Sequence, residues 1–283
     1  MIVWVASYPK SGNTFLRILL SDYMYGDLDK EYNFSNLNKI EMFPNLFRYY
    51  PLVDEKIISN LIELQKEENI LNHSIYLQKK FFSKGIHFVK THSANFNFNN
   101  IKFTNNEITA CAIYIVRDPR NVLTSYSEYL NQSKDYVLDL MSQEITIRQK
   151  HKHMMLPTTY VGSWKTNYLS WRDAQVFFPI KIIKYENLIS NTEEVFFEIL
   201  LFLNKFAKID IDNFKMQLVI KRTEFTKLQE LEKKGLFHEM NDFDKNNYFF
   251  KSGAKRNWKA SLEDNYINGI NKFFSNEIDN LGY

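Results

Sequence analysis

The chain has 283 residues, and its 36 lysines and arginines almost balance its 33 aspartates and glutamates, which leaves a net charge of +3. With 45% hydrophobic and 16% aromatic residues it is long and apolar enough to bury a large core, so a disordered chain is excluded. A charge this close to neutral also argues against nucleic acid as a partner, because binding phosphate backbones takes a broad basic surface.

The cysteine content and the lengths of the apolar runs narrow the protein class further. A single cysteine, Cys111, rules out an intramolecular disulfide and a multi-cysteine zinc site. No apolar run approaches the roughly 18 residues of a membrane span, and the first residues lack the basic start of a secretory signal. We therefore expect a cytoplasmic protein with no membrane span and a reduced, buried cysteine.

Four short apolar runs rich in β-branched and aromatic residues predict buried strands, over residues 2–6, 86–90, 110–116 and 180–184. Amphipathic patterns predict helices over residues 15–25, 54–68, 120–130 and 193–203. Asn191 and Glu194 form a capping-box-like start to the last of these helices. Strands that alternate with helices indicate an α/β fold, so we predict a single domain over residues 1–283, with a central parallel sheet flanked by helices.

In such sheets ligands bind beyond the carboxyl ends of the strands. The first strand runs directly into Ser7-Tyr8-Pro9-Lys10-Ser11-Gly12-Asn13-Thr14-Phe15 and then a helix. The amides of the helix start, the glycine, the hydroxyl and amide side chains and the lysine predict a P-loop-like anion-binding site, although a simple turn with a surface lysine is the alternative. The ATP-binding Walker loop places its lysine directly after the second glycine, whereas Lys10 precedes Gly12, which disfavours an ordinary Walker kinase.

The segment Tyr-Pro-Lys-Ser-Gly-Asn-Thr-Phe resembles the phosphosulfate-binding loop of sulfotransferases that use 3′-phosphoadenosine 5′-phosphosulfate (PAPS). The resemblance implies that Lys10, Ser11, Gly12, Asn13 and Thr14 bind the donor. PAPS would be the sulfonate donor, 3′-phosphoadenosine 5′-phosphate (PAP) the product, and no metal would be needed.

A second match follows the third predicted strand, where Arg117 and Ser125 stand eight residues apart, as in the family's 3′-phosphate motif. A guanidinium can hold a phosphate through two hydrogen bonds while a hydroxyl supplies a third. Arg117 could instead pair with Asp118. Lys251, Ser252 and Gly253 resemble the family's Arg-Lys-Gly segment, which would complete the 3′-phosphate site. The first two positions depart from the family pattern, and the segment could also be a solvated basic turn.

The second predicted strand ends in Lys90-Thr91-His92, which is similar to the family's Lys-x-His with the histidine as catalytic base. Histidine suits that role near neutral pH, although a lone histidine at a strand end is more often structural. The resemblance implies that Lys10 offsets charge on the leaving phosphate, Lys90 steadies the sulfonate, and Ser125 holds Lys10 between turnovers. The acceptor would be a small molecule with a hydroxyl or an amine.

The adenine contacts follow from further matches in the family's order. Gly162-Ser163-Trp164-x-x-Asn167-x-x-x-Trp171 and the segment at Tyr185 resemble the middle of bacterial and plant-like members, in which the tyrosine reaches the adenine. Phe15 would stack on the other face of the adenine, and Thr223 with Phe225 resembles the family's Thr-x-Phe contact. The matches run from Ser7 to Lys259, nearly the whole chain.

Two rival functions remain. A nucleotide-dependent kinase would need Mg²⁺ and an acidic ligand, for which Asp118 and Glu186 are the candidates. A non-catalytic protein that binds a 3′,5′-bisphosphate nucleotide would have the same pocket with His92 idle. We assign no metal to His151 and His153, because residues two apart on a helix do not share a face. The family's dimer motif is not recognisable after Lys259, so the sequence predicts no oligomeric state.

Overall fold

The computed structural model describes residues 1–43, 67–95, 97–98, 101–151, 154–237, 239, 248–250 and 257–283. The chain divides into two compact units, each assembled from three stretches of sequence. The first unit comprises Met1–Tyr8, Glu41–Tyr114 and Leu140–Ile182. The second comprises Pro9–Ile40, Ile115–Asp139 and Ile183–Tyr283.

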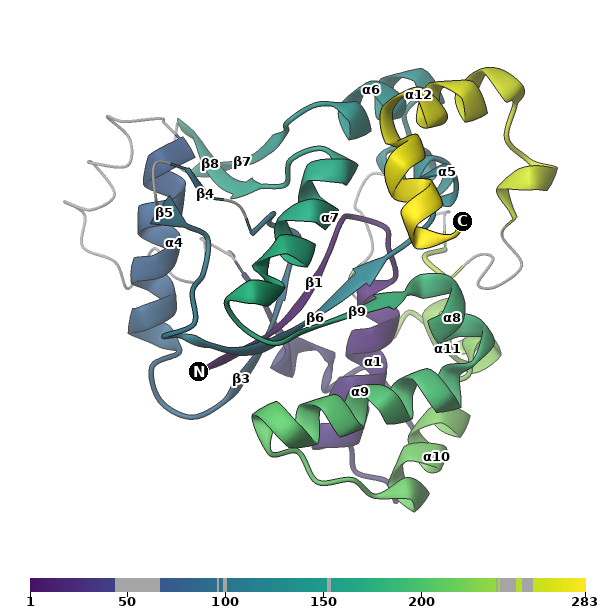
Figure 1. The fold of residues 1–283 in the computed structure, drawn as a ribbon. Coiled ribbons are helices and arrows are strands. Elements are labelled where there is room, and N and C mark those ends of the chain that lie inside the picture. Colours follow the sequence, from purple (N-terminus) through teal and green to yellow (C-terminus); the bar gives the residue numbers. More distant parts are fainter. Residues whose placement is uncertain are drawn as a thin grey trace. The chain divides into compact units, whose positions relative to one another are not determined.

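A five-stranded sheet in the order β2-β3-β1-β6-β9 confirms the predicted α/β architecture (Figure 1). Its strands are β1 (Ile2–Ser7), β2 (Glu41–Met42), β3 (His87–Thr91), β6 (Thr109–Val116) and β9 (Ile180–Lys184). All four predicted strands are present. β3 pairs in parallel with both β1 and β2, and the β1–β3 register sets Ala6 opposite Thr91. Every residue of β1 is buried, which is why it reads as an unbroken apolar run.

Ten α-helices accompany the strands in the part of the chain that the structure describes. They are α1 (Asn13–Tyr25), α4 (Glu67–Phe81), α5 (Pro119–Leu130), α6 (Lys134–Ser142), α7 (Trp164–Asp173), α8 (Tyr185–Ser190), α9 (Thr192–Ala207), α10 (Asn213–Arg222), α11 (Phe225–Lys233) and α12 (Asp264–Leu281). The predicted helices at 15–25, 120–130 and 193–203 correspond to α1, α5 and α9. Most of the predicted helix at 54–68 lies outside the described residues.

Two expectations about local structure are wrong. The stretch read as helical around His151 belongs to an antiparallel pair, β7 (Thr146–His151) and β8 (Met154–Tyr160), and residues 152 and 153 lie outside the description. Its polar sequence does not alternate, so local periodicity did not predict a strand. Pairing between the two segments stabilises both strands. Asn191 precedes α9, but its side chain makes no capping bond. It also ends α8, where its amide donates to the carbonyl of Asn187.

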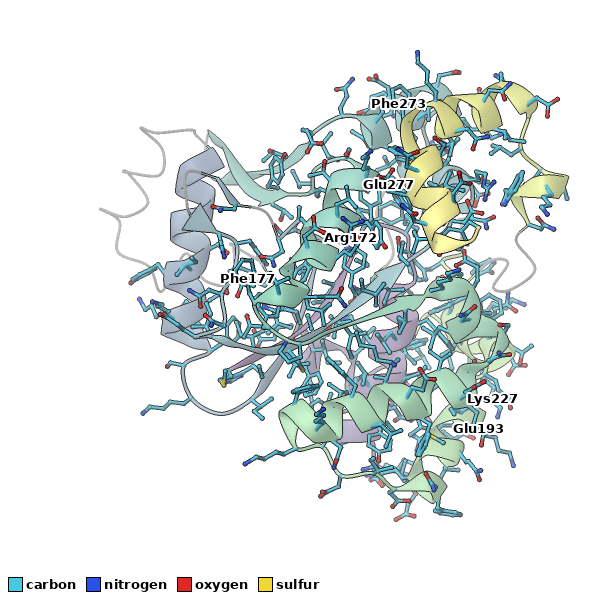
Figure 2. All side chains as sticks on the ribbon, in the orientation of Figure 1. Arg172, Phe177, Glu193, Lys227, Phe273 and Glu277 are labelled. Carbon is cyan, nitrogen blue, oxygen red and sulfur yellow. The ribbon has the colours of Figure 1, made fainter. Side chains whose placement is uncertain are left out.

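Each unit has its own aromatic core. In the first unit, Trp4 packs against Phe43, Phe103 and Trp171, with ring centroids 5.2–6.4 Å apart, and donates from Nε1 to Thr109 Oγ1. In the second, a cluster gathers residues of α1, α11 and the segments near both: Ile18, Tyr32, Phe34, Leu37, Leu228, Phe237 and Phe250. The apolar side chains left at the surface include Phe177 and Phe273 (Figure 2). No described helix is long and apolar enough to cross a membrane.

Candidate active site

The loop from β1 into α1 has the backbone geometry of an anion site. Lys10 and Gly12 both have positive φ values, +64° and +98°. Only glycine adopts such angles at low cost, so the left-handed Lys10 marks a constrained backbone of the kind that gathers at functional sites. Gly12 occupies the N-cap position of α1, and Asn13 and Thr14 follow as its first, buried residues. The positive end of this helix therefore begins directly at the loop.

The Ser11 hydroxyl gives the clearest indication that the loop fits a ligand. Its side chain is fully buried, and its hydroxyl has no hydrogen-bond partner among the described residues. A buried hydroxyl without a partner costs roughly 1–3 kcal/mol, so native structures rarely leave one in that state. A phosphate oxygen seated in the loop would accept this bond, and an anion is the ligand that the loop geometry favours.

The ring of Tyr185 connects the loop to Arg117. A β-carbon at Gly12 would lie 2.2 Å from Tyr185 Cδ2, so ring and backbone are in direct contact. The guanidinium of Arg117 lies over the same ring, 4.3 Å from its centroid, and donates from Nη1 to the carbonyl oxygen of Lys10 at 2.9 Å. Arg117, predicted for the 3′-phosphate, is thus a buried cation anchored on the loop. Ser125 lies two turns into α5, half-buried.

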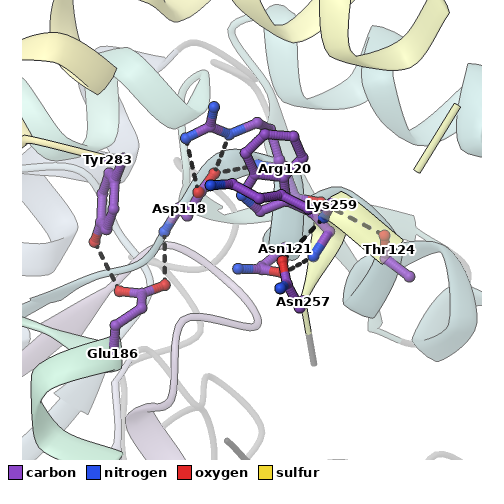
Figure 3. A network of polar contacts seen from close by, with 9 residues as sticks. Asp118, Arg120, Asn121, Thr124, Glu186, Asn257, Lys259 and Tyr283 are labelled. Carbon is purple, nitrogen blue, oxygen red and sulfur yellow. Dashed lines mark hydrogen bonds and ion pairs between the residues drawn. The ribbon is translucent and has the colours of Figure 1, made fainter. Parts of the chain in front are cut away.

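A polar network holds the start of α5, just after Arg117 (Figure 3). The Asp118 carboxylate caps the helix by accepting from the Arg120 amide, and both its oxygens accept from the Arg120 guanidinium, at 2.8 and 2.9 Å. Glu186 accepts from the Asp118 amide and from the Tyr283 hydroxyl. Burial raises the pKa of Glu186. The two carboxylates that a kinase would need for Mg²⁺ are both committed to these structural bonds.

The C-terminal segment joins this network. The Trp258 amide donates to Asn121 Oδ1 at 3.1 Å, and the Arg120 guanidinium lies 4.0 Å from the Trp258 ring centroid. Asn257 caps the short turn that follows, accepting from the Lys259 amide (Figure 3). The predicted donor residues Lys251, Ser252 and Gly253 come shortly before this anchor in the chain but lie outside the described residues.

Two aromatic rings surround the Lys10 ammonium. Its Nζ is 4.2 Å from the centroid of Tyr129 and 4.4 Å from that of Phe249. The buried carboxylate of Glu232 in turn accepts from the amides of Phe249 and Phe250, which fixes that aromatic pair on α11. Neither ring was predicted from the sequence, because neither lies in the motif that contains Lys10.

Three residues predicted to bind adenine, Phe15, Thr223 and Phe225, lie in the second unit and differ in their contacts. Phe15 and Phe225 are partly buried and pack against the aromatic cluster around Phe34. Thr223 ends α10 and is almost fully buried, and its hydroxyl donates to the carbonyl of Val219 at 2.7 Å. Its proton is therefore used inside the helix, which leaves only its acceptor capacity for a nucleotide.

His92 belongs to the first unit, one residue beyond β3. Its Nδ1 lies 2.8 Å from the carbonyl oxygen of Ser7 and 3.3 Å from the Ser7 hydroxyl. A carbonyl oxygen only accepts, so Nδ1 carries the proton of the neutral ring and the basic lone pair is on Nε2. Lys90, two residues earlier, is buried in β3. Parallel pairing of β1 with β3 brings Ser7 and His92 together, as expected for neighbouring strand ends.

Comparisons with known proteins place these features in a family context. A family model described as a sulfotransferase domain matches residues 2–282. A 3-beta-hydroxysteroid sulfotransferase of Cavia porcellus is 26% identical over 151 residues, 53% of this chain and 50% of that protein. The luciferin sulfotransferase of Photinus pyralis is 24% identical across 93% of this chain and 68% of its own length. The chain thus matches about half the length of the first relative.

Solved structures share the fold. A mouse sulfotransferase, SULT7A1, complexed with PAP superposes with a TM-score of 0.56 at 18% identity, covering 99% of this chain and 85% of that chain. Retinol dehydratase in complex with androsterone and inactive cofactor PAP gives a TM-score of 0.57 at 14% identity, covering 98% and 80%. At these identities the likeness establishes the architecture, and it agrees with the predicted central parallel sheet.

Proposed function

The chain belongs to the sulfotransferase domain family, and we propose that it transfers a sulfonate group from PAPS to a hydroxyl group of a small molecule, with an amine as the alternative acceptor. The family model spans both compact units. We therefore propose that residues 1–283 work as one sulfotransferase domain, without a metal, in the cytoplasm.

The observation that carries this proposal is the buried Ser11 hydroxyl without a partner among the described residues, set between the left-handed residues Lys10 and Gly12. These residues fit a phosphate-bearing donor, because loop amides, a helix start and a hydroxyl are the groups that bind phosphate in proteins. Asn13 and Thr14 would contribute at the same helix start.

When bound, PAPS supplies the sulfonate and a 5′-phosphate leaving group. His92 would take the acceptor's proton at Nε2, the nitrogen left basic by the bond from Nδ1 to the Ser7 carbonyl. The Lys10 ammonium would stabilise negative charge on the leaving oxygen, and Lys90 would steady the sulfonate. Ser125 would hold Lys10 between turnovers.

The remaining donor residues would supply binding energy remote from the reaction. Arg117 and Ser125 would hold the 3′-phosphate, together with Lys251, Ser252 and Gly253. The adenine would lie among the rings of Phe15, Tyr185 and Phe225 with Thr223. Arg117 suits the 3′-phosphate because it is buried and held on the loop through the Lys10 carbonyl, so little of its freedom remains to be lost on binding.

The acceptor class is proposed from the chain's relatives. The two curated relatives are named for a hydroxysteroid and for luciferin, and the retinol dehydratase complex contains androsterone. All are small molecules. We propose an acceptor of that kind rather than a nucleic acid.

Calorimetric titration with PAP, in the presence of EDTA and with ADP as the control, tests the donor site. We expect PAP to bind without metal and ADP to bind far more weakly, because ADP lacks the 3′-phosphate. Equal binding of ADP, or binding that requires Mg²⁺, would contradict the proposal and favour a kinase. PAP binding with no turnover of PAPS on a broad panel of phenols and alcohols would favour a non-catalytic nucleotide-binding protein.

A further inference from the structure

We propose that Asn167 is a positioning residue for His92, which fixes the main chain of the proposed base and thereby its tautomer. This inference rests on the proposed function only in the role that it gives His92. Asn167 lies on α7 and is fully buried.

Both polar atoms of the Asn167 side-chain amide are hydrogen-bonded. Nδ2 donates to the carbonyl of His92 at 3.0 Å and to the carbonyl of Val161 at 2.7 Å. Oδ1 accepts from the Tyr114 hydroxyl at 2.8 Å. Because that hydroxyl donates, it also determines which end of the amide faces His92. Tyr114 is itself buried and hydrogen-bonds to the backbone of Tyr8, at the start of the anion-binding loop.

Residues 92–95, the His92 segment, need such an anchor because β3 ends at Thr91. The five-stranded sheet therefore supplies no ladder bonds beyond that residue. One face of α7 holds the segment instead, together with the Tyr160 carbonyl of β8, which accepts from the Ala94 amide at 2.8 Å. Asn167 binds the His92 carbonyl, Trp171 Nε1 donates to the Ser93 carbonyl at 2.9 Å, and the Asn95 amide donates to Ser170 Oγ at 2.9 Å. The three helix residues are spaced i, i+3 and i+4, which places them side by side.

A fixed His92 main chain has a chemical consequence. The bond from Nδ1 to the Ser7 carbonyl depends on the distance between the ends of β1 and β3, because each partner belongs to one of these strand ends. If the His92 carbonyl loses its anchor, this bond weakens and the ring begins to populate the other tautomer. Nε2 then carries the proton for part of the time, so Nε2 is no longer the basic nitrogen in every molecule.

Nitrogen-15 NMR of the histidine rings in the full chain, without donor or acceptor, tests this proposal. The chain has six histidines, so His92→Gln identifies the His92 signals by their loss. In the native protein we expect Nδ1 to carry the proton at a pH above the histidine pKa. Asn167→Asp, which turns a carboxylate toward two carbonyl oxygens, should shift the tautomer ratio roughly three- to tenfold, the effect of one hydrogen bond.

Tyr114→Phe provides a second variant that keeps the buried shape and removes only the hydroxyl that orients the amide. It should shift the ratio in the same direction by less, and it decides the matter if Asn167→Asp does not fold. Ser163→Ala is the matched control, because the Ser163 hydroxyl caps α7 by accepting from the Thr166 amide. The bond that joins Ser163 to Asn167 runs from the Asn167 amide to the Ser163 carbonyl, and this main-chain bond is kept in alanine. It should lower stability and leave the His92 tautomer unchanged.

A native tautomer ratio in both Asn167→Asp and Tyr114→Phe, or in Tyr114→Phe alone if the other variant does not fold, would overturn the proposal. An equal shift in Ser163→Ala would also overturn it, because general loosening of α7 would then explain the effect. Titration of each variant with PAP separates this result from the proposed function. If the native protein does not bind PAP, the proposed donor site is refuted. The tautomer measurement does not involve the donor and is unaffected by that result.

Discussion

The ring of Tyr185 packs so closely on Gly12 that a β-carbon there would lie 2.2 Å from Cδ2 and 2.7 Å from Cε2. The same ring supports the Arg117 guanidinium at 4.3 Å. One aromatic side chain therefore fixes both the glycine of the anion-binding loop and the arginine predicted for the 3′-phosphate. The sequence motif assigned this tyrosine to adenine, and the structure adds its contact with the loop.

Gly12→Ala should destabilise the protein by roughly 2–5 kcal/mol, combining about 1–2 kcal/mol of left-handed backbone strain with about 1–3 kcal/mol of overpacking. PAP binding should fall with it. Gly85→Ala is the matched control, since Gly85 also has a positive φ, +74°, but among the described residues no atom other than those of its chain neighbours lies within 4 Å of its added β-carbon. Urea denaturation of both variants measures the difference, and equal losses would mean that the Tyr185 contact adds nothing.

Four of the five strands could be predicted because they are apolar runs rich in β-branched and aromatic residues, whereas the two-residue β2 is not buried and was not predicted. The predicted strand at 180–184 matches β9 at both ends, and the other three agree within a residue or two. The candidate site residues in motifs at strand ends could be proposed in the same way, since His92 and Arg117 each follow a strand directly and Lys10 comes three residues after β1. Local sequence suffices where one short segment contains both the fold signal and the chemistry.

Long-range partners could not be predicted. Asn167 binds His92 across 75 positions of sequence, and the Tyr283 hydroxyl reaches Glu186 across 97. The β7–β8 pair was missed for a similar reason, because its strands are stabilised by each other rather than by an apolar alternation. Asn167 stood inside a recognised motif, Gly-Ser-Trp-x-x-Asn, which marked it as notable without indicating its bonds.

Arg117→Ala should weaken PAP binding by roughly 2–5 kcal/mol, because a desolvated phosphate would lose its charged partner. Arg117→Lys should recover only part of this loss, since an ammonium cannot make the two parallel bonds of a guanidinium. Isothermal titration with PAP measures both. The control is Arg172→Ala, which removes a partly exposed arginine that pairs with Asp173 in the first unit (Figure 2). Undiminished PAP affinity in Arg117→Ala would remove this residue from the donor site.

His92→Ala should lower turnover by roughly 10² to 10⁴, the usual contribution of a general base, while PAP affinity stays within about twofold of the native value. Assays with PAPS and an acceptor from the phenol and alcohol panel measure turnover. His87→Ala is the control at the other end of β3, where Nε2 of His87 is hydrogen-bonded to the Lys84 carbonyl. Native turnover in His92→Ala would exclude His92 as the base, as would equal losses in both variants.

Asp22 should make the stability depend on pH in the mildly acidic range. Burial raises the pKa of its carboxyl from 3.8 to about 6, against the opposing charges of Arg222 and Lys215. Asp22 is only 1% exposed, and its Oδ2 lies 3.3 Å from Arg222 Nε. The folded protein therefore binds this proton more tightly than the unfolded chain does.

The sign of the effect follows from that difference. The free energy of unfolding should fall as the pH rises from about 4 through about 6, by up to about 3 kcal/mol, because the unfolded chain gives up the proton more easily. Asp22→Asn cannot titrate, so its stability relative to the native protein should increase over the same interval. Urea denaturation at several pH values measures this difference, with the exposed Asp29→Asn as the control. A difference that stays constant or decreases with rising pH would show that the pKa of Asp22 is not raised.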